Sequence, residues 1–327
     1  MNSEAGPILL VGAPRSGTTL LRAMLNRHPR IGLCDETYFH YWVAQRAGLF
    51  GDLADAAQRA RAVDRLLELR RIRRLGLDLA QLREHLVATA TSCPLLFLEL
   101  MRFHAQAGGK VRFGEKTPHH ALVARELLAW FPDARLIHLV RDPRDVVASL
   151  RHMPWGSGSL LTDARLWRDC VDGVERCGAR QNLLVVRYET LIEQPEAELR
   201  RLCDFLGEPF DAAMVAAGAP ARSDRWWFDR AQGAIDGSRR DRWREELSHG
   251  DAACVEWIAG ERLARYGYAA AERPAGALTK LRGRLGAAAA ALQEGVRHLP
   301  ATFWRVVAPD RIALQERIFD GATDDDE

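Results

Sequence analysis

The chain has 327 residues, of which 47% are hydrophobic and 28% charged, and its 46 Lys and Arg nearly balance its 44 Asp and Glu. A formal charge of +2 argues against a dedicated nucleic-acid-binding protein, so an electrostatic partner must be recognised by a local site. No apolar run is long enough to span a membrane, and the short stretch before the first expected strand leaves no room for a signal peptide. We therefore expect a cytoplasmic protein. The six cysteines form no CxxC pair or zinc-ligand pattern, which favours reduced thiols and no metal.

The apolar run Ile8–Val11 predicts a buried strand, and the small polar segment Gly12–Thr19 after it leads into apolar residues at helical spacing. Such a strand, loop and helix form a phosphate cradle, because the backbone N–H groups and the helix N-terminus point at an anion. The spacing nearly matches the nucleotide-binding P-loop, but Thr18 stands where that loop has its phosphate-clamping lysine. The cation is Arg15 instead. We expect a phosphoanhydride ligand other than the ATP of a kinase; the alternative is a plain strand-to-helix turn.

Two neighbouring carboxylates, Asp35 and Glu36, follow a short extended segment after the first helix. Acidic residues usually mark a solvated face, but these lie among apolar and aromatic residues close to the loop in sequence. From about 43 to 107 the chain is expected to be helical. Part of this stretch is rich in arginine: Arg59, Arg61, Arg65, Arg70, Arg71, Arg73 and Arg74. That part is either a solvated helix face or a surface that meets an acidic substrate or partner.

Three more strands are expected, at 111–116, 136–140 and 183–187, and each is followed by a turn or a helix. Lys116 falls at the end of the first of these strands. Ligands collect at the carboxyl ends of the strands in an α/β sheet. Lys116 is therefore either a ligand-binding residue or an ordinary surface lysine.

A helix is expected directly after the strand at 136–140, because Asp142 is a suitable N-cap and Pro143 suits the first helical position. Arg141 then lies at the carboxyl end of the strand, and Ser149 lies about two turns into the helix. A guanidinium can bind a phosphate through two hydrogen bonds, and a hydroxyl can add one more. The alternative role for Arg141 is a structural ion pair.

Strands that alternate with helices predict an α/β fold, of the P-loop NTPase-like three-layer α/β/α type with a mainly parallel central sheet. We expect one domain over 1–270, with a helical insertion at about 43–110. Residues 271–327 are expected to form a helical C-terminal extension with an acidic end, packed on its own domain or on a second subunit. The basic segment 238–244 either wraps an anion or is a solvated turn with Trp243 packed on the core.

Together these segments resemble the sulfotransferases that use 3′-phosphoadenosine-5′-phosphosulfate (PAPS), especially the bacterial members and the tyrosylprotein sulfotransferases. The resemblance covers most of 7–268. It implies that PAPS is the donor and that the product is 3′-phosphoadenosine-5′-phosphate (PAP). The nucleotide-binding residues that it implies are Arg15, Ser16, Gly17, Thr18, Thr19, Arg141, Ser149, Tyr188 and, by a looser match, Arg239 and Arg240.

The resemblance also implies the catalytic residues. Glu36 matches the glutamate that acts as general base in the tyrosylprotein branch, and Lys116 matches a catalytic lysine. Together with Arg15, Lys116 would stabilise the negative charge that develops on the departing nucleotide, without a metal. The other candidates for the base are Asp35, His119 and His120.

Two other functions stay open at this point: a P-loop kinase for a small molecule, and a non-catalytic nucleotide-binding protein on the same fold. The hydroxyl-bearing acceptor could be a sugar, a lipid, a peptide tyrosine or a natural product. A homodimer is compatible with the sequence, and neither a nucleic-acid partner nor a transmembrane segment is expected.

Overall fold

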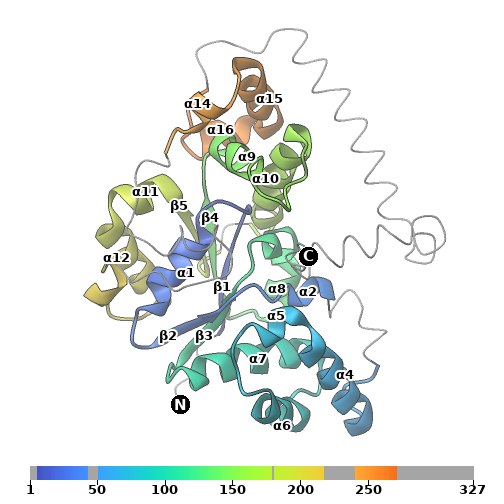
Figure 1. The fold of residues 1–327 in the computed structure, drawn as a ribbon. Coiled ribbons are helices and arrows are strands. Elements are labelled where there is room, and N and C mark those ends of the chain that lie inside the picture. The colour runs from blue at the N-terminus through green and yellow to red at the C-terminus, as the bar shows by residue number, and fades with distance from the viewer. Residues whose placement is uncertain (1–5, 43–50, 179, 217–239, 271–327) are drawn as a thin grey trace, which may run out of the picture. The chain divides into compact units, whose positions relative to one another are not determined.

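The computed structural model describes residues 6–42, 51–178, 180–216 and 240–270 (Figure 1). The chain divides into two compact units. The first runs up to Arg141 and resumes from Asp169 to Arg240, and the second comprises Asp142–Arg168 and the chain from Asp241 onward. The expected extension at 271–327 and Arg239 lie outside the described residues.

The first unit is built on one sheet of five strands, which are β1 (Ile8–Gly12), β2 (Ile31–Cys34), β3 (Arg112–Lys116), β4 (Arg135–Val140) and β5 (Leu183–Arg187). Their order is β2-β3-β1-β4-β5, and every neighbouring pair is parallel. The four strands expected from the sequence are present. The short extended segment before Asp35 is a fifth strand, β2, at one edge.

The sheet has a topological switch point beside β1. Strands β1 and β3 are neighbours, with Leu10 opposite Lys116. The chain leaves β1 toward the edge strand β2, whereas it leaves β3 toward β4 on the other side of β1. Open α/β sheets bind ligands at the carboxyl ends of the strands where the connections diverge in this way. The fold therefore predicts a ligand-binding site at the loop after β1 and at the end of β3.

Helices α1 (Thr18–Asn26), α11 (Tyr188–Glu193) and α12 (Pro195–Leu206) cover one face of the sheet (Figure 1). Apolar residues three and four apart make one face of α1 buried, which is the pattern of an amphipathic helix. That face packs with α12 against the strands, and the shared core includes Leu21, Leu25, Leu199, Leu202, Ile8, Leu10, Ile137 and Leu139. Gly207, with φ 70°, ends α12 in the left-handed conformation that glycine adopts readily.

The other face is covered by α7 (Cys93–Ala107), which packs on β2 and β3, and by the 3₁₀ helix η2 (Pro118–Val123), which packs on β1. Helix α8 (Ala124–Trp130) continues η2, so the helix expected after Lys116 begins as a 3₁₀ segment. The expected helical stretch is broken into α2 (Phe39–Trp42), α4 (Ala56–Glu68), α5 (Arg70–Arg73), α6 (Leu79–Thr89) and α7. Side-chain N-caps at Asp55, Asp78 and Ser92 start three of these helices. Helices on both faces of a parallel sheet confirm the three-layer α/β class.

Within its described residues, the second unit contains the helices α9 (Pro143–Leu150), the first part of α10 (Leu160–Glu175), α14 (Trp243–Glu246), α15 (His249–Ala259) and α16 (Glu261–Arg265). As expected, Asp142 caps α9, because its Oδ1 accepts a hydrogen bond from Arg144 N at 2.8 Å. Val147, Ala164 and Val255 form a small core among these helices. In the described parts of the chain, the helices are all too short or too polar to cross a membrane.

Candidate active site

The loop between β1 and α1 has a backbone suited to an anion. Gly17 precedes α1 with φ 97°, and Arg15 also lies in the left-handed region with φ 71°. A Cβ on Gly17 would lie 2.5 Å from Cδ2 of Tyr188, so a larger residue would clash with the ring. The loop therefore needs glycine at this point both for its conformation and for the close approach of Tyr188.

Ser16, at the centre of this loop, fits a ligand with exposed oxygen atoms. Its side chain is fully buried, and its Oγ has no hydrogen-bond partner among the described residues. Buried hydroxyl groups are normally hydrogen-bonded, and an orphaned one calls for an explanation. An oxygen of a nucleotide phosphate held by the loop and by the first amides of α1 would supply the partner.

Lys116 connects the loop to the two carboxylates. Its Nζ lies 2.6 Å from Glu36 Oε1, 2.9 Å from Asp35 Oδ1 and 3.4 Å from Thr19 Oγ1. The lysine side chain is fully buried, whereas those of Glu36 and Asp35 are 20% and 36% exposed. A buried ammonium group needs opposite charge nearby, which these carboxylates provide. The structure thus brings together Lys116, Glu36 and the loop, three features that are far apart in sequence, and Lys116 is not an ordinary surface lysine.

Asp35 is a poor candidate for the general base. Burial alone would raise its pKa, but the positive charges of Lys116 and of Arg22, whose Nη2 is 3.5 Å from Asp35 Oδ2, outweigh burial. The pKa of Asp35 is therefore held well below its usual range. So weak a base is poorly suited to accept a proton at neutral pH.

The two histidines after Lys116 are both engaged by neighbouring side chains. His119 Nδ1 lies 2.8 Å from the hydroxyl of Tyr38, and burial lowers the pKa of His119 to about 4. His120 Nδ1 lies 2.9 Å from the buried carboxylate of Glu115. Both were alternative bases on sequence grounds. Their contacts give them structural partners within the protein.

Arg71, from the arginine-rich segment, also reaches this region. Its Nη1 lies 3.9 Å from Glu36 Oε2, and its guanidinium lies 4.2 Å from the centre of the Tyr38 ring. The sequence left the segment's role open between a solvated face and a surface for an acidic partner. Arg71 itself is not part of a solvated face, because it lies beside the predicted base and its side chain is only 12% exposed.

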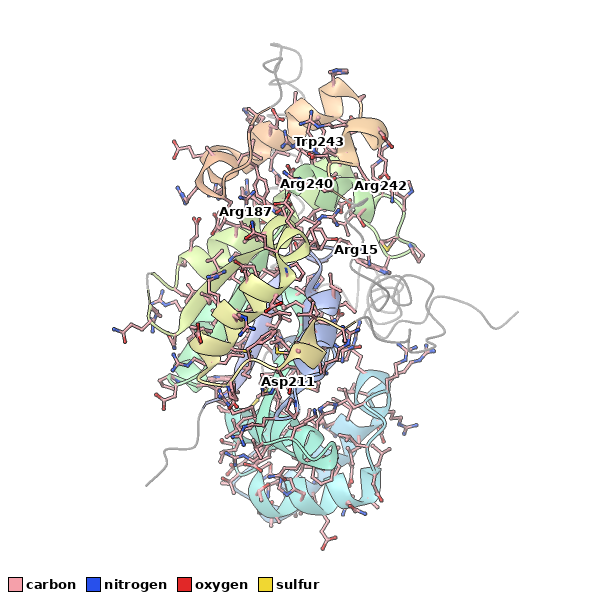
Figure 2. The ribbon with its side chains drawn as sticks, turned by 90° about the vertical axis from the view of Figure 1, so that its left-hand side faces the viewer. Arg15, Arg187, Asp211, Arg240, Arg242 and Trp243 are labelled. Carbon is pink, nitrogen blue, oxygen red and sulfur yellow. The ribbon has the colours of Figure 1, made fainter. Side chains whose placement is uncertain are left out.

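Arg141 and Tyr188 meet beside the loop. Arg141 Nη1 donates a hydrogen bond to the carbonyl oxygen of Arg15 at 3.2 Å, and its guanidinium lies 4.6 Å from the centre of the Tyr188 ring. Both side chains are buried. Figure 2 labels Arg15 and Arg187, which follow β1 and end β5 at the carboxyl edge of the sheet.

The other predicted nucleotide contacts are Arg240, Ser149 and Arg239. Arg240 is half exposed and forms an ion pair with Glu193 in the first unit. Ser149 lies on α9, which belongs to the second unit. Arg239 is outside the described residues.

In the second unit, Trp243 packs on α9, as the sequence allowed (Figure 2). Asp145 accepts hydrogen bonds from the backbone N–H groups of Asp241 and Trp243, each at 3.0 Å. The guanidinium of Arg144 lies 4.0 Å from the centre of the Trp243 ring and also binds the carboxylate of Asp142. The start of α14 is thus fixed by side chains from α9.

Comparison with known proteins is consistent with this geometry. Residues 7–212 match the model of the sulfotransferase family. The chain is 29% identical over 218 residues to protein-tyrosine sulfotransferase A of Caenorhabditis elegans, an alignment that covers 62% of this chain and 50% of that protein. It is 28% identical over 307 residues to the nodulation protein NoeE of Sinorhizobium fredii, covering 82% of this chain and 68% of that protein.

Among solved structures, the sulfotransferase domain of the curacin biosynthetic pathway superimposes with a TM-score of 0.56 at 20% identity, covering 82% of this chain and 99% of that domain. This likeness confirms the fold. The chain belongs to the sulfotransferase family. It spans about half the length of the curated protein-tyrosine sulfotransferases that it matches, from 40% to 56% for three of them.

Proposed function

We propose that this chain is an enzyme that transfers a sulfonate group from PAPS to a hydroxyl group of an acceptor. The observation that carries the proposal is the position of Lys116, which is fully buried and joins Glu36 to Thr19 of the phosphate-type loop. A cation within hydrogen-bond reach of both a carboxylate and an anion-binding loop provides the groups that such a transfer requires. Membership of the sulfotransferase family supports the same reaction.

The loop residues Arg15, Ser16, Gly17, Thr18 and Thr19 would hold the 5′ end of the nucleotide. The orphaned hydroxyl of Ser16 and the first amides of α1 are the donors that fit phosphate oxygens. Arg141 and Tyr188, which stack on each other beside the loop, would bind its 3′-phosphate and its adenosine. We assign Ser149, Arg239 and Arg240 to the 3′-phosphate as well, on the family resemblance alone.

The chemistry follows from the charges on the chain. PAPS, when bound, supplies the sulfonate group and leaves as PAP. Glu36 accepts the proton of the acceptor hydroxyl as the new bond between oxygen and sulfur forms. Lys116 and Arg15 stabilise the negative charge that appears on the nucleotide oxygen as its bond to sulfur breaks.

The ion pair between Lys116 and Glu36 must loosen for both residues to act, and Asp35 can hold the lysine while this happens. Asp35 is anchored in turn by Arg22 and has a lowered pKa, so it stays ionised. Lys116 therefore keeps a negative partner when Glu36 becomes protonated.

A thermal-shift experiment tests the nucleotide assignment. We expect PAP without metal to raise the melting temperature, and ATP with Mg²⁺ to leave it unchanged, because Thr18 replaces the lysine of the P-loop. Stabilisation by ATP with Mg²⁺ alone would point to a small-molecule kinase. PAP binding without turnover on any acceptor would point to a non-catalytic nucleotide-binding protein.

The acceptor can be identified with PAPS carrying labelled sulfur. We propose an acceptor with a free hydroxyl group, and a panel of sugars, lipids, tyrosine peptides and phenolic natural products covers the main classes. Two relatives give the panel its starting points, since one is called a protein-tyrosine sulfotransferase and the other a nodulation protein. Label transfer, followed by mass spectrometry of the product, would show which hydroxyl is modified.

A further inference from the structure

Glu115 on β3 is a buried carboxylate that the proposed reaction does not use. Its side chain is 1% exposed. Oε1 accepts hydrogen bonds from Thr37 N at 3.0 Å, from Thr37 Oγ1 at 2.6 Å and from Thr117 Oγ1. Oε2 lies 2.9 Å from His120 Nδ1, which is a donor in the tautomer whose Nε2 faces the backbone N–H of His40. Because it is enclosed by these groups, Glu115 cannot touch a substrate.

The segment that Glu115 holds is the one that follows Glu36. Tyr38 has φ 52°, and a bulky residue is unfavourable in this left-handed region. The turn is held together by hydroxyl groups: Tyr38 N donates to Thr117 Oγ1 at 3.4 Å, and Phe39 N donates to Thr37 Oγ1 at 3.1 Å. Both hydroxyls also donate to Glu115. The two hydroxyls that hold the unfavourable turn are thus held in turn by one buried carboxylate.

We propose that Glu115 is a positioning residue, which fixes the Glu36–Thr37 segment against β3 so that the carboxylate of Glu36 stays at Lys116. This inference rests on the proposed function, in which Glu36 is the base. Successive side chains of a strand point to opposite faces of the sheet. Glu115 and Lys116 therefore contact two successive residues of the segment, Thr37 and Glu36. Lys116 holds Glu36 by charge, and Glu115 holds Thr37 by hydrogen bonds.

The charge of Glu115 is maintained by the same contacts. Burial raises its pKa, but the neighbouring His120 and the hydrogen bonds from Thr117 and Thr37 outweigh burial and lower the pKa below its usual value. A carboxylate accepts through both oxygens and so satisfies all four donors at once. A glutamine at position 115 would present an N–H group to at least one of these donors, and that donor would lose its acceptor.

Thr37→Val and Thr37→Ser form a matched pair that tests the proposal. Valine keeps the shape of threonine but loses the hydroxyl, and serine keeps the hydroxyl. We expect Thr37→Val to lower turnover at saturating acceptor by about 10-fold, the value of one hydrogen bond to a charged group, with PAP affinity unchanged. Thr37→Ser should stay within about 2-fold of the wild type, because its hydroxyl can still reach Glu115.

The same change in the Glu36→Gln background separates positioning from general loss of structure. If Thr37 acts through the base, Thr37→Val should cost nothing further once Glu36 cannot accept a proton. The same fold loss in both backgrounds, or wild-type turnover for Thr37→Val alone, would overturn the proposal.

Amide hydrogen exchange tests the anchoring without any activity. The amides of Thr37 and Tyr38 donate to Glu115 and to Thr117, and Thr37→Val leaves both acceptors in place. If the Thr37 hydroxyl anchors the segment to Glu115, these two amides should exchange faster in Thr37→Val than in Thr37→Ser, while β1 and β4 stay protected. Equal exchange in the two variants would exclude the anchoring. If the wild type does not turn over PAPS, or if Glu36→Gln keeps full activity, the proposed function fails, and the exchange result still decides whether Glu115 holds the turn.

Discussion

The two ends of strand β3 carry buried cations with different surroundings. At the amino end, Arg112 Nη1 donates to Glu208 Oε1 at 3.0 Å and to the carbonyl oxygen of Leu206 at 2.6 Å. Glu208 Oε2 also accepts from Arg30 Nε at 2.7 Å. At the carboxyl end, one lysine faces the two carboxylates of Asp35 and Glu36.

The difference lies in which partner is accessible. Glu208 is 5% exposed and Arg112 is 9% exposed, so this pair is closed to solvent, although the second arginine, Arg30, is 54% exposed. At the other end the lysine is buried, while its two carboxylates are partly open to solvent. A single ammonium that can turn between two accessible carboxylates suits a site where charges move during a reaction. We therefore expect changes at the carboxyl end to alter rate, and changes at the amino end to alter stability.

The largest effect should come from Glu36→Gln, which keeps the shape of the side chain but removes its ability to accept a proton. Turnover should fall by about 10²–10⁴, the usual value of general base catalysis, with PAP affinity little changed. Label transfer from PAPS at saturating acceptor gives the rate, and calorimetry gives the affinity. Near-normal turnover would place the base elsewhere.

Lys116→Ala should also lower turnover strongly, because it removes charge from beside the departing nucleotide oxygen. Combining it with Glu36→Gln tests whether both residues act on one transition state. The double variant should lose less than the product of the two single losses. A strictly multiplicative loss would mean that the two residues act independently, despite the 2.6 Å contact between them.

Arg141→Ala should weaken PAP binding by about 10- to 100-fold, the value of hydrogen bonds between a guanidinium and a phosphate. Adenosine 5′-phosphosulfate, which lacks the 3′-phosphate, serves as the control ligand, and its affinity should hardly change. An equal loss for both ligands would assign Arg141 to the loop structure through its contact with the carbonyl of Arg15.

At the amino end, Glu208→Gln should lower the free energy of unfolding by about 3 kcal/mol, because it leaves Arg112 buried without its carboxylate. The folded fraction should keep its turnover rate, since this cluster is at the edge of the sheet opposite the site. Chemical denaturation measures the free energy of unfolding, and active-site titration allows the turnover rate to be given per folded molecule. A rate loss as large as that of Glu36→Gln would contradict the division between the ends.

The smallest effect concerns pH. Burial raises the pKa of Glu208, but its hydrogen bonds to Arg30 and Arg112 outweigh burial and hold the pKa below its ordinary value of 4.5. A group with a lowered folded pKa stabilises the protein above the unfolded pKa, and this stabilisation is lost as pH falls through the folded value. The wild type should therefore lose more stability than Glu208→Gln below about pH 4.5, as followed by denaturation at a series of pH values. Parallel curves would mean that Glu208 does not contribute in this way.

Features that depend on local chemistry were predictable from the sequence. The strands β1, β4 and β5 contain short apolar runs, and Asp142 with Pro143 marks the start of α9. The loop after β1 and the position of Lys116 at a strand end also followed from local patterns. These features need only the residues beside them.

Features that depend on the tertiary fold were not predictable. Nothing in the run of arginines distinguishes Arg71, which reaches Glu36 only because α5 packs near the carboxyl end of β3. The sequence predicts Glu115 only as part of a strand. A glutamate in a fully buried strand does indicate that hydrogen-bond partners exist, but not which residues they are. Thr37, the partner that links Glu115 to the site, lies 78 positions earlier in the chain, and no local spacing predicts that contact.

The backbone of Arg15 has a consequence for protein engineering. Its φ of 71° is one that glycine or asparagine adopts at lower cost than arginine. A screen for thermal stability without nucleotide should therefore favour Arg15→Gly, while a screen in the presence of PAP should reject it. Variants chosen for heat resistance alone would drift toward an inactive protein at this position, as expected where strain is retained for the sake of function.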